Sequence, residues 1–76
     1  MYNKFYLHEF QIFDGEAIIT FNIVDLNEMN NEIKVAITNR GRISVVTYTL
    51  FKDDQGYYFE YGCEYQKIKL SDFKEV

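Results

Sequence analysis

The chain has 76 residues, of which 47% are hydrophobic and 18% aromatic, which is enough for one small core and too little for a second domain. Its net charge of −4 at pH 7 excludes the broad basic surface with which proteins follow duplex nucleic acid. A single cysteine excludes an internal disulfide, and one cysteine with one histidine cannot supply the four ligands of a structural zinc site. We therefore predict a single domain, residues 1–76, that is stabilised by packing alone.

The N-terminus and the length of the apolar runs bear on the compartment. Glu9 interrupts the apolar residues near the start, so no signal peptide is visible. The longest apolar runs are two or three residues, whereas a membrane helix needs about 18 or more. We expect a cytoplasmic protein that does not bind a membrane. Asn, Lys, Ile, Tyr and Phe, which have A+T-rich codons, make up 34 of the 76 residues and indicate a low-GC bacterium or its phage as the source.

The first predicted element is a β-hairpin. The chain contains no proline, and its apolar segments are rich in β-branched and aromatic residues, which favour strands. A two-residue turn at 14–15, where Asp precedes Gly, pairs Ile12 with Ala17 and Phe10 with Ile19. One face of this hairpin is then almost entirely apolar.

The segment 25–32 has two interpretations, which the residues leave open. It is either a loop or a single helical turn in which Asp25 is the N-cap and Leu26 and Met29 face inward.

The second predicted hairpin turns at Asn-Arg-Gly, residues 39–41. We prefer a three-residue loop here, because a two-residue type I′ turn would force Arg40 to positive φ. The three-residue loop pairs Ile37 with Ile43 and Val35 with Val45.

The third predicted hairpin has a three-residue loop at 54–56 and pairs Phe51 with Phe59. Because strand 43–52 is apolar on both faces, we expect it to be central or to bend from one layer to another. Both of these hairpins place odd-numbered side chains on one core face. The predicted core face consists of Ile33, Val35, Ile37, Ile43, Val45, Phe51, Phe59, Tyr61 and Cys63.

The C-terminal part predicts one more strand and a cap. Gly62 indicates a bulge or a tight turn, alternation of apolar residues predicts a sixth strand at about 65–70, and Ser71 is a candidate cap for a terminal turn. The fold class is therefore all-β, a small antiparallel barrel or rolled meander of five to six strands with at most one short helical turn. Its resemblance to SH3-like and OB-like domains is limited to size and strand count.

No group of residues in the sequence has the pattern of a catalytic or cofactor site. His8 and Cys63 are the only side chains suited to nucleophilic or general-base chemistry near neutral pH, and their spacing does not bring them together. Asp53 and Asp54 are typical of a hairpin turn rather than of a calcium loop. We predict a protein without catalytic residues, metal ligands or cofactor.

The charge pattern is the most informative functional signal. Residues 1–39 carry six acidic residues against two lysines, so the whole net charge lies in the first half of the chain. Acidic and tyrosine side chains suit a surface that binds a basic protein, including one that normally holds nucleic acid. We expect a non-enzymatic regulator or inhibitor with an unidentified protein partner, and self-pairing of an edge strand into a homodimer is the simplest association. The predicted partner-binding residues are Glu9, Asp14, Glu16, Asp25, Glu28, Glu32, Tyr48 and Tyr58.

The alternative is a β-barrel that binds single-stranded nucleic acid. Such proteins combine a positive groove with aromatic rings on which bases stack. The net charge makes nucleic acid the less favoured partner. The residues of this alternative are Arg40, Arg42, Lys67, Lys69 and the surface tyrosines.

Overall fold

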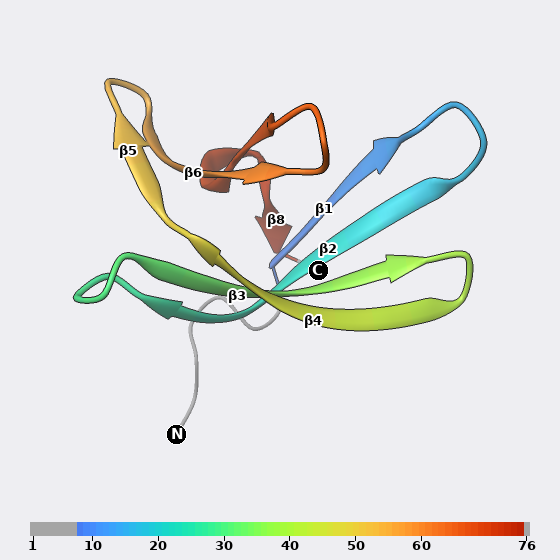
Figure 1. Ribbon diagram of the computed structural model, residues 1–76, viewed down its shortest axis with the longest axis horizontal. Helices are drawn as coiled ribbons and strands as arrows, with labels where there is room; N and C mark the ends of the chain where they lie inside the picture. Colours follow the sequence, from blue (N-terminus) through green and yellow to red (C-terminus); the bar gives the residue numbers. More distant parts are fainter. Residues whose placement is uncertain (1–7, 76) are drawn as a thin grey trace.

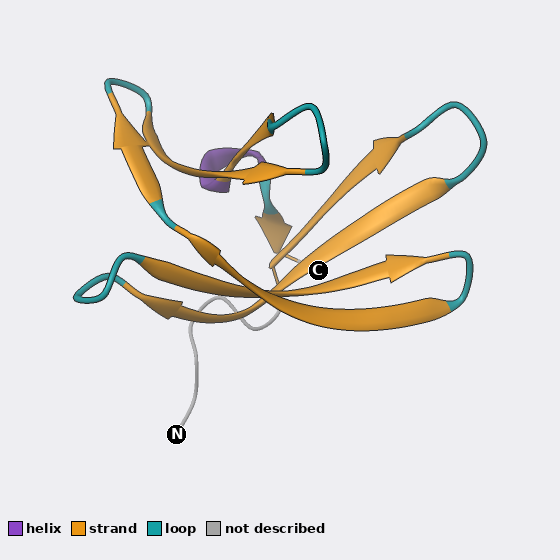
Figure 2. Cartoon of the chain, viewed as in Figure 1, coloured by secondary structure: helices purple, strands orange, loops and turns teal. Residues whose placement is uncertain are grey.

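The computed structural model describes residues 8–75, and over this range the chain forms eight strands and one 3-10 helix (Figures 1 and 2). All strands are antiparallel and lie in two sheets. The predicted all-β class and the single short helical turn are confirmed, with more strands than the five to six predicted. Among residues 8–75 the two sheets do not close into a barrel.

The large sheet has five strands in the order β4-β3-β2-β1-β8. These strands are β1 His8–Phe13, β2 Ile18–Asn27, β3 Glu32–Asn39, β4 Arg42–Thr49 and β8 Lys74–Glu75. The small sheet has three strands in the order β5-β6-β7. These are β5 Phe51–Asp53, β6 Gly56–Tyr61 and β7 Gln66–Lys69, followed by the 3-10 helix η1, Leu70–Asp72.

A single residue, Leu50, connects β4 of the large sheet to β5 of the small sheet. Its side chain is 4% exposed, and its N–H donates a hydrogen bond of 2.7 Å to the carbonyl of Asn31. The predicted bend of this strand from one layer to the other is confirmed. Figure 1 shows the chain leaving the large sheet here and rising into the small one.

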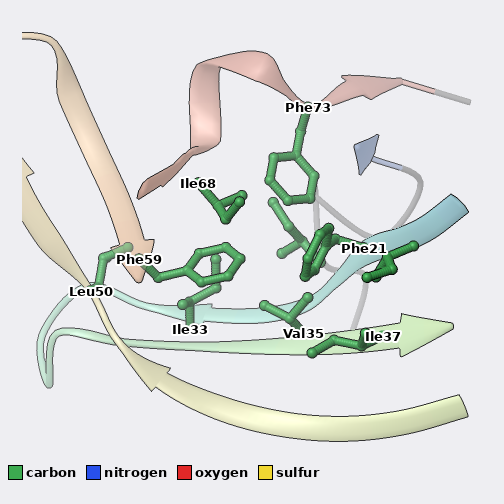
Figure 3. Packing of buried hydrophobic residues seen from close by; sticks show 10 residues of the cluster. Phe21, Ile33, Val35, Ile37, Leu50, Phe59, Ile68 and Phe73 are labelled. Carbon is green, nitrogen blue, oxygen red and sulfur yellow. The ribbon is translucent and has the colours of Figure 1, made fainter. Parts of the chain in front are cut away.

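The hydrophobic core lies between the two sheets (Figure 3). Phe21 of β2 and Phe59 of β6 are fully buried, and their ring centroids are 6.0 Å apart. Phe73, which follows η1, closes the core from the C-terminal side. The complete set of buried hydrophobic residues is Ile19, Phe21, Ile23, Ile33, Val35, Ile37, Leu50, Phe59, Ile68 and Phe73.

The β1–β2 hairpin has a different register from the predicted one. Phe10 lies opposite Phe21, and Ile12 lies opposite Ile19, which is a shift of two residues. Because side chains alternate with a period of two, this shift leaves the same set on the core side. The predicted pairs were wrong, and the predicted apolar face was right.

A capped turn explains this shift. The loop spans residues 14–17, and the N–H of Asp14 donates to the carbonyl of Ala17 at 3.1 Å. A side-chain oxygen of Asp14 accepts hydrogen bonds from the backbone N–H groups of Glu16 and Ala17, at 2.9 and 2.8 Å. These bonds stabilise a four-residue loop in place of the two-residue turn.

The segment 25–32 is a hairpin connection, not a helix. Strand β2 continues to Asn27, and residues 28–31 form the turn, in which the N–H of Asn31 donates to the carbonyl of Glu28. Leu26 is half-buried against the core. Met29 is 95% exposed, which contradicts the helical-turn alternative, in which it faces inward.

The β3–β4 hairpin overturns the predicted three-residue loop. Arg40 and Gly41 have φ values of +53° and +81°, so they form a two-residue turn with both residues in the left-handed region. Asn39 consequently lies opposite Arg42. A left-handed arginine costs about 1–2 kcal/mol, and the turn is adopted nonetheless.

This one-residue difference inverts strand β4. Val35 lies opposite Val46 rather than Val45, and the side chains of Val46 and Tyr48 pack on the core. Ile43 and Val45 were predicted to lie in the core and are 70% and 59% exposed. The prediction was wrong because an odd shift moves every side chain to the other face.

The β5–β6 hairpin also turns over two residues, 54–55, so Phe51 lies opposite Tyr58 rather than Phe59. Phe59 and Tyr61 still pack in the core as predicted. Phe51 is 38% exposed and Cys63 is exposed, so their predicted core positions were wrong.

The C-terminal prediction holds for the strand and fails for the cap. Strand β7 occupies the predicted region, and Gly62, with a φ of +78°, begins a tight turn in which the N–H of Tyr65 donates to its carbonyl at 3.2 Å. Lys69 is at the N-cap of η1, without a side-chain cap bond, and Ser71 lies inside the helix.

Candidate functional site

One face of the large sheet carries the exposed apolar side chains. We call it the outer face; it is the side of β1–β4 opposite the core. Phe13, Ile18, Ile43 and Val45 lie on it, with 69%, 57%, 70% and 59% of their surfaces exposed. Contiguous exposed apolar patches on a protein surface mark interaction sites.

Strand pairing places these four residues on one face as two apolar pairs, with two threonines between the pairs. Phe13 lies directly opposite Ile18, and Ile43 lies opposite Thr38. Thr38 in turn lies opposite Thr20 of β2. The two threonines therefore bridge the apolar pair on β1–β2 and the apolar residues of β4.

Three of the six predicted acidic residues share this outer face. They are Glu9, Asp25 and Glu32, which lie opposite Asn22, Lys34 and Thr49 respectively. Glu9 also lies opposite Lys74 of β8. The acids therefore share the face with the apolar residues but lie toward its other end, with Lys34 and Lys74 as their neighbouring positive charges.

The other three predicted acids lie in turns at opposite ends of β2. Asp14 and Glu16 are in the β1–β2 loop, and Glu28 is in the β2–β3 turn. The ten residues of β2 separate these ends by about 30 Å. The structure thus divides the predicted acidic surface rather than gathering it.

The charge of the β1–β2 loop is also partly neutralised. The guanidinium of Arg40, from the neighbouring β3–β4 turn, forms an exposed ion pair with Glu16. The backbone N–H groups of Ala17 and Glu16 hold the pKa of Asp14 below its usual value. Both acids therefore already have partners within the chain.

Tyr48 lies on the core side of β4. Its ring stacks on Phe59 with the centroids 4.9 Å apart, and burial raises the pKa of its hydroxyl. Tyr48 is thus separated by the large sheet from the acids of the outer face.

Tyr58 lies on the exposed side of the small sheet, within a group of aromatic and basic residues. Its ring stacks on Phe51 with centroids 5.5 Å apart, and the Nζ of Lys67 lies 4.4 Å from the Tyr58 centroid. Lys69 lies opposite Tyr58 on β7. We call Phe51, Tyr58, Lys67 and Lys69 the aromatic–lysine group.

Both lysines of this group have partners in the β5–β6 hairpin, one at the end of β5 and one in the turn. Lys67 forms a salt bridge of 2.8 Å to Asp53, and Lys69 donates a hydrogen bond to Gln55. The hydrogen bond from Lys67 lowers the pKa of Asp53, and the same bond raises the pKa of Lys67. Arg40 lies in the β3–β4 turn and Arg42 begins β4 of the large sheet, so the four basic residues of the alternative reading form two separate groups.

The remaining candidates do not assemble a reaction centre. Cys63 is exposed in the β6–β7 turn, whereas His8 is half-buried at the start of β1 in the other sheet. Within residues 8–75, no group of three or more His, Cys, Asp or Glu side chains is placed to hold a metal ion. In the same range, no helix is both long and apolar enough to cross a membrane.

The surface also has depressions of modest size. One of about 430 Å³ lies where β8 meets β1, and another of about 270 Å³ lies at the β5–β6 turn. Ligand pockets of this volume are mostly apolar, whereas these depressions are lined largely by charged and amide side chains. The first is lined by Glu9, Phe10, Gln11, Asp72, Lys74 and Glu75, the second by Asp53, Asp54, Gln55 and Lys67.

The sequence prediction missed the four apolar residues of the outer face. Ile43 and Val45 were assigned to the core, and the available signal was that strand 43–52 is apolar on both faces. Phe13 and Ile18 flank a turn and alternate with the core residues Ile12 and Ile19, which is the signal that they point outward. No protein-family model, no curated protein and no solved structure matches the chain.

Proposed function

We propose that the domain binds a protein partner through the outer face of the large sheet. In this role it is a cytoplasmic, non-enzymatic regulator or inhibitor. The observation that carries the proposal is the exposure of Phe13, Ile18, Ile43 and Val45 on one face, each more than half exposed. Covering this much apolar surface with another protein is favourable, since about 25 cal/mol is gained per Å² of apolar area removed from water.

Charge on the same face supports a basic partner. Glu9, Asp25 and Glu32 lie on the same face as the apolar residues, and the chain as a whole carries −4. Complementary charge at the rim of an interface raises the association rate and selects the partner. A basic protein with an apolar centre to its contact surface, including one that otherwise binds nucleic acid, fits this arrangement.

The test is capture from a lysate of a low-GC bacterium with matched variants. Ile18→Lys places a charge on the outer face, whereas Met29→Lys places the same charge in the β2–β3 turn, where Met29 is 95% exposed. We expect a protein that is retained by the unmodified domain and by Met29→Lys, and whose affinity falls by roughly tenfold or more with Ile18→Lys. Equal capture by both variants, or none above a charge-matched control protein, contradicts the proposal.

A second candidate function is binding of single-stranded nucleic acid by the aromatic–lysine group. The supporting observation is the stack of Phe51 on Tyr58, beside two lysines, on the exposed side of a small β-sheet. Rings so placed can stack on bases while lysines hold phosphates. The salt bridge between Lys67 and Asp53 weighs against this candidate, because Lys67 would have to leave the carboxylate of Asp53 in order to bind a phosphate.

This candidate is tested by oligonucleotide binding at low and high salt. Tyr58→Ala is expected to weaken binding by about 1–3 kcal/mol, and Tyr65→Ala, which removes a 71% exposed ring from the β6–β7 turn, is the matched control. Binding must also weaken as salt rises. Absence of binding to a single-stranded oligonucleotide at low salt removes this candidate.

A further inference from the structure

Strand β4 is an unprotected edge of the large sheet. It pairs with β3 on one side and is last in the strand order, so its other side has no neighbouring strand among residues 8–75. Its eight residues contain one charge, Arg42, and its pairing with β3 shows no bulge. Natural edge strands are usually shielded by proline, by charge or by bulges. Strand β4 has almost none of these features.

The two-residue turn fixes which backbone groups point to the free side. In such a hairpin the residues flanking the turn, Asn39 and Arg42, form a hydrogen-bonded pair, and bonded pairs then recur at every second residue. The bond from Leu50 to Asn31 continues this even-numbered series. The odd-numbered residues of β4, from Ile43 to Thr49, therefore direct their N–H and carbonyl groups away from β3.

We propose that two copies of the chain pair through β4, antiparallel and about a two-fold axis at Val46. This pairing joins the two five-stranded sheets into one continuous sheet. The inference does not rest on the proposed function, because it needs no foreign partner.

The two-fold register uses every free backbone group of β4. Ile43 lies opposite Thr49 of the second copy, and Val45 lies opposite Thr47 of the second copy. All of these residues direct hydrogen-bonding groups outward, so each pair exchanges two hydrogen bonds. On the core side, the small Ser44 comes beside the large Tyr48 of the second copy. Any other register leaves outward groups of Ile43 or Thr49 unpaired within the strand.

The absence of acidic residues from β4 makes this strand compatible with a second copy as the occupant. The chain carries −4, so two copies repel one another wherever acidic surfaces meet. Strand β4 has no acidic residue. Its single charge, Arg42, lies near one end of the strand, so the two arginines are roughly 27 Å apart in this register. Like charges therefore do not oppose one another across the new pair.

The pairing also enlarges the outer face. Ile43 and Val45 lie on the free edge of that face, so the residues of both copies meet around the axis. β-branched side chains directly across a strand pair stabilise that pair.

The first experiment measures the solution mass by light scattering over a range of concentrations. We expect the unmodified chain to reach twice the monomer mass as concentration rises. Val45→Pro removes an outward N–H and should give a monomer, whereas Val45→Thr retains that N–H and should remain a dimer. A strict monomer at every concentration overturns the proposal. So does a dimer that Ile18→Lys disrupts and Val45→Pro does not, because this result places the contact on the outer face.

The second experiment tests the register and does not depend on the proline variant folding. In a Cys63→Ser background, Val46→Cys places two thiols at the axis, where opposed Cα atoms are about 4.5 Å apart and a disulfide can form. Val45→Cys places them about 8–9 Å apart, which is beyond the reach of a disulfide. Oxidation should cross-link the first variant and not the second. The reverse result overturns the proposed register, and no cross-link in either variant overturns the pairing.

Discussion

The rings of Phe21 and Tyr61 meet edge to face, with their centroids 4.9 Å apart and their planes at 85°. Phe21 belongs to β2 of the large sheet and Tyr61 to β6 of the small one. Such aromatic pairs contribute about 0.5–1.5 kcal/mol beyond the burial of their area. Because the small sheet has only three strands, it depends on this contact and its neighbours for stability.

Replacing Phe21 with alanine should therefore remove a large part of the protein's stability. The expected cost is about 3–5 kcal/mol, and the stability of a chain of this length is about 4–11 kcal/mol. Phe13→Ala is the matched control, since it removes the same ring from a position that is 69% exposed. Thermal melts followed by circular dichroism should show a large loss for Phe21→Ala and about 0.5 kcal/mol or less for Phe13→Ala. Similar losses would mean that Phe21 is not a core residue.

Whether the predicted core face was correct depended on the size of the error in each strand register. A shift by an even number of residues leaves the same side chains on the core, and a shift by an odd number exchanges the two faces. At the first hairpin, the capped loop of Asp14 shifted the pairing by two residues, and the apolar face remained correct. At the second, a shift of one residue moved Val45 out of the core and Val46 into it. The composition was sufficient to predict the strands. The register of a hairpin, however, is set by the type of its turn, and the turn type here depends on whether Arg40 accepts positive φ.

The arginine takes this conformation because the whole strand gains from it. The observed turn places Val46 and Tyr48 of β4 on the core, where Tyr48 stacks on Phe59. The local backbone penalty of about 1–2 kcal/mol is of the same order as the burial of one large apolar side chain, about 1.5–3 kcal/mol, so which β4 side chains fit the core can override it. The rule that a non-glycine residue avoids positive φ considers Arg40 alone and does not include the packing of the β4 side chains on the core.

The candidate site was less predictable than the fold for the same reason. Charge counting located the acids in the first half of the chain, yet it could not show that Glu9 and Glu32 share a face while Glu28 lies in a turn. The exposure of Ile43 and Val45 depends only on the register of β4. A functional surface of this kind therefore cannot be predicted before the type of each turn is known.

Glycine at position 41 should be required by the β3–β4 turn. Its φ is +81°, and a Cβ added there would meet no atom within 4 Å, so any cost of substitution is conformational rather than steric. We expect Gly41→Ala to reduce the free energy of unfolding by about 1 kcal/mol. Gly41→Asn should cost less, because asparagine tolerates left-handed backbone. Urea unfolding measures both, and equal costs would show that the turn does not hold residue 41 at positive φ.

The ion pair between Asp53 and Lys67 should give the stability a defined pH dependence. The hydrogen bond from Lys67 lowers the pKa of Asp53 below its ordinary value of 3.8. The stability that the ionised Asp53 contributes is fully present above the pKa of this residue in the unfolded chain. It is lost as the pH falls through the lower pKa of the folded protein. The pKa of Lys67 is raised above 10.5, so the contribution of the lysine is present below that value and is lost as pH rises through the folded pKa.

Carboxyl NMR titration checks this prediction. In Lys67→Met the pKa of Asp53 should rise toward its ordinary value, since the first cause of its depression is removed. Lys52→Met is the control, because Lys52 lies over the ring of Tyr57 and is not among the causes of the shift at Asp53. An Asp53 pKa unchanged by Lys67→Met would mean that the salt bridge is not formed in solution.

Neighbouring valines in β4 provide a direct test of its register. Val46 packs against the core, whereas Val45 is 59% exposed on the outer face. A threonine hydroxyl in place of a methyl group costs about 1 kcal/mol or more where it is withdrawn from water without a partner. It costs about 0.5 kcal/mol or less on an exposed strand surface. Val46→Thr should therefore lower the urea midpoint measurably, and Val45→Thr should leave it almost unchanged. The opposite order would restore the three-residue loop at 39–41 and return Val45 to the core, because only a one-residue shift exchanges the two positions.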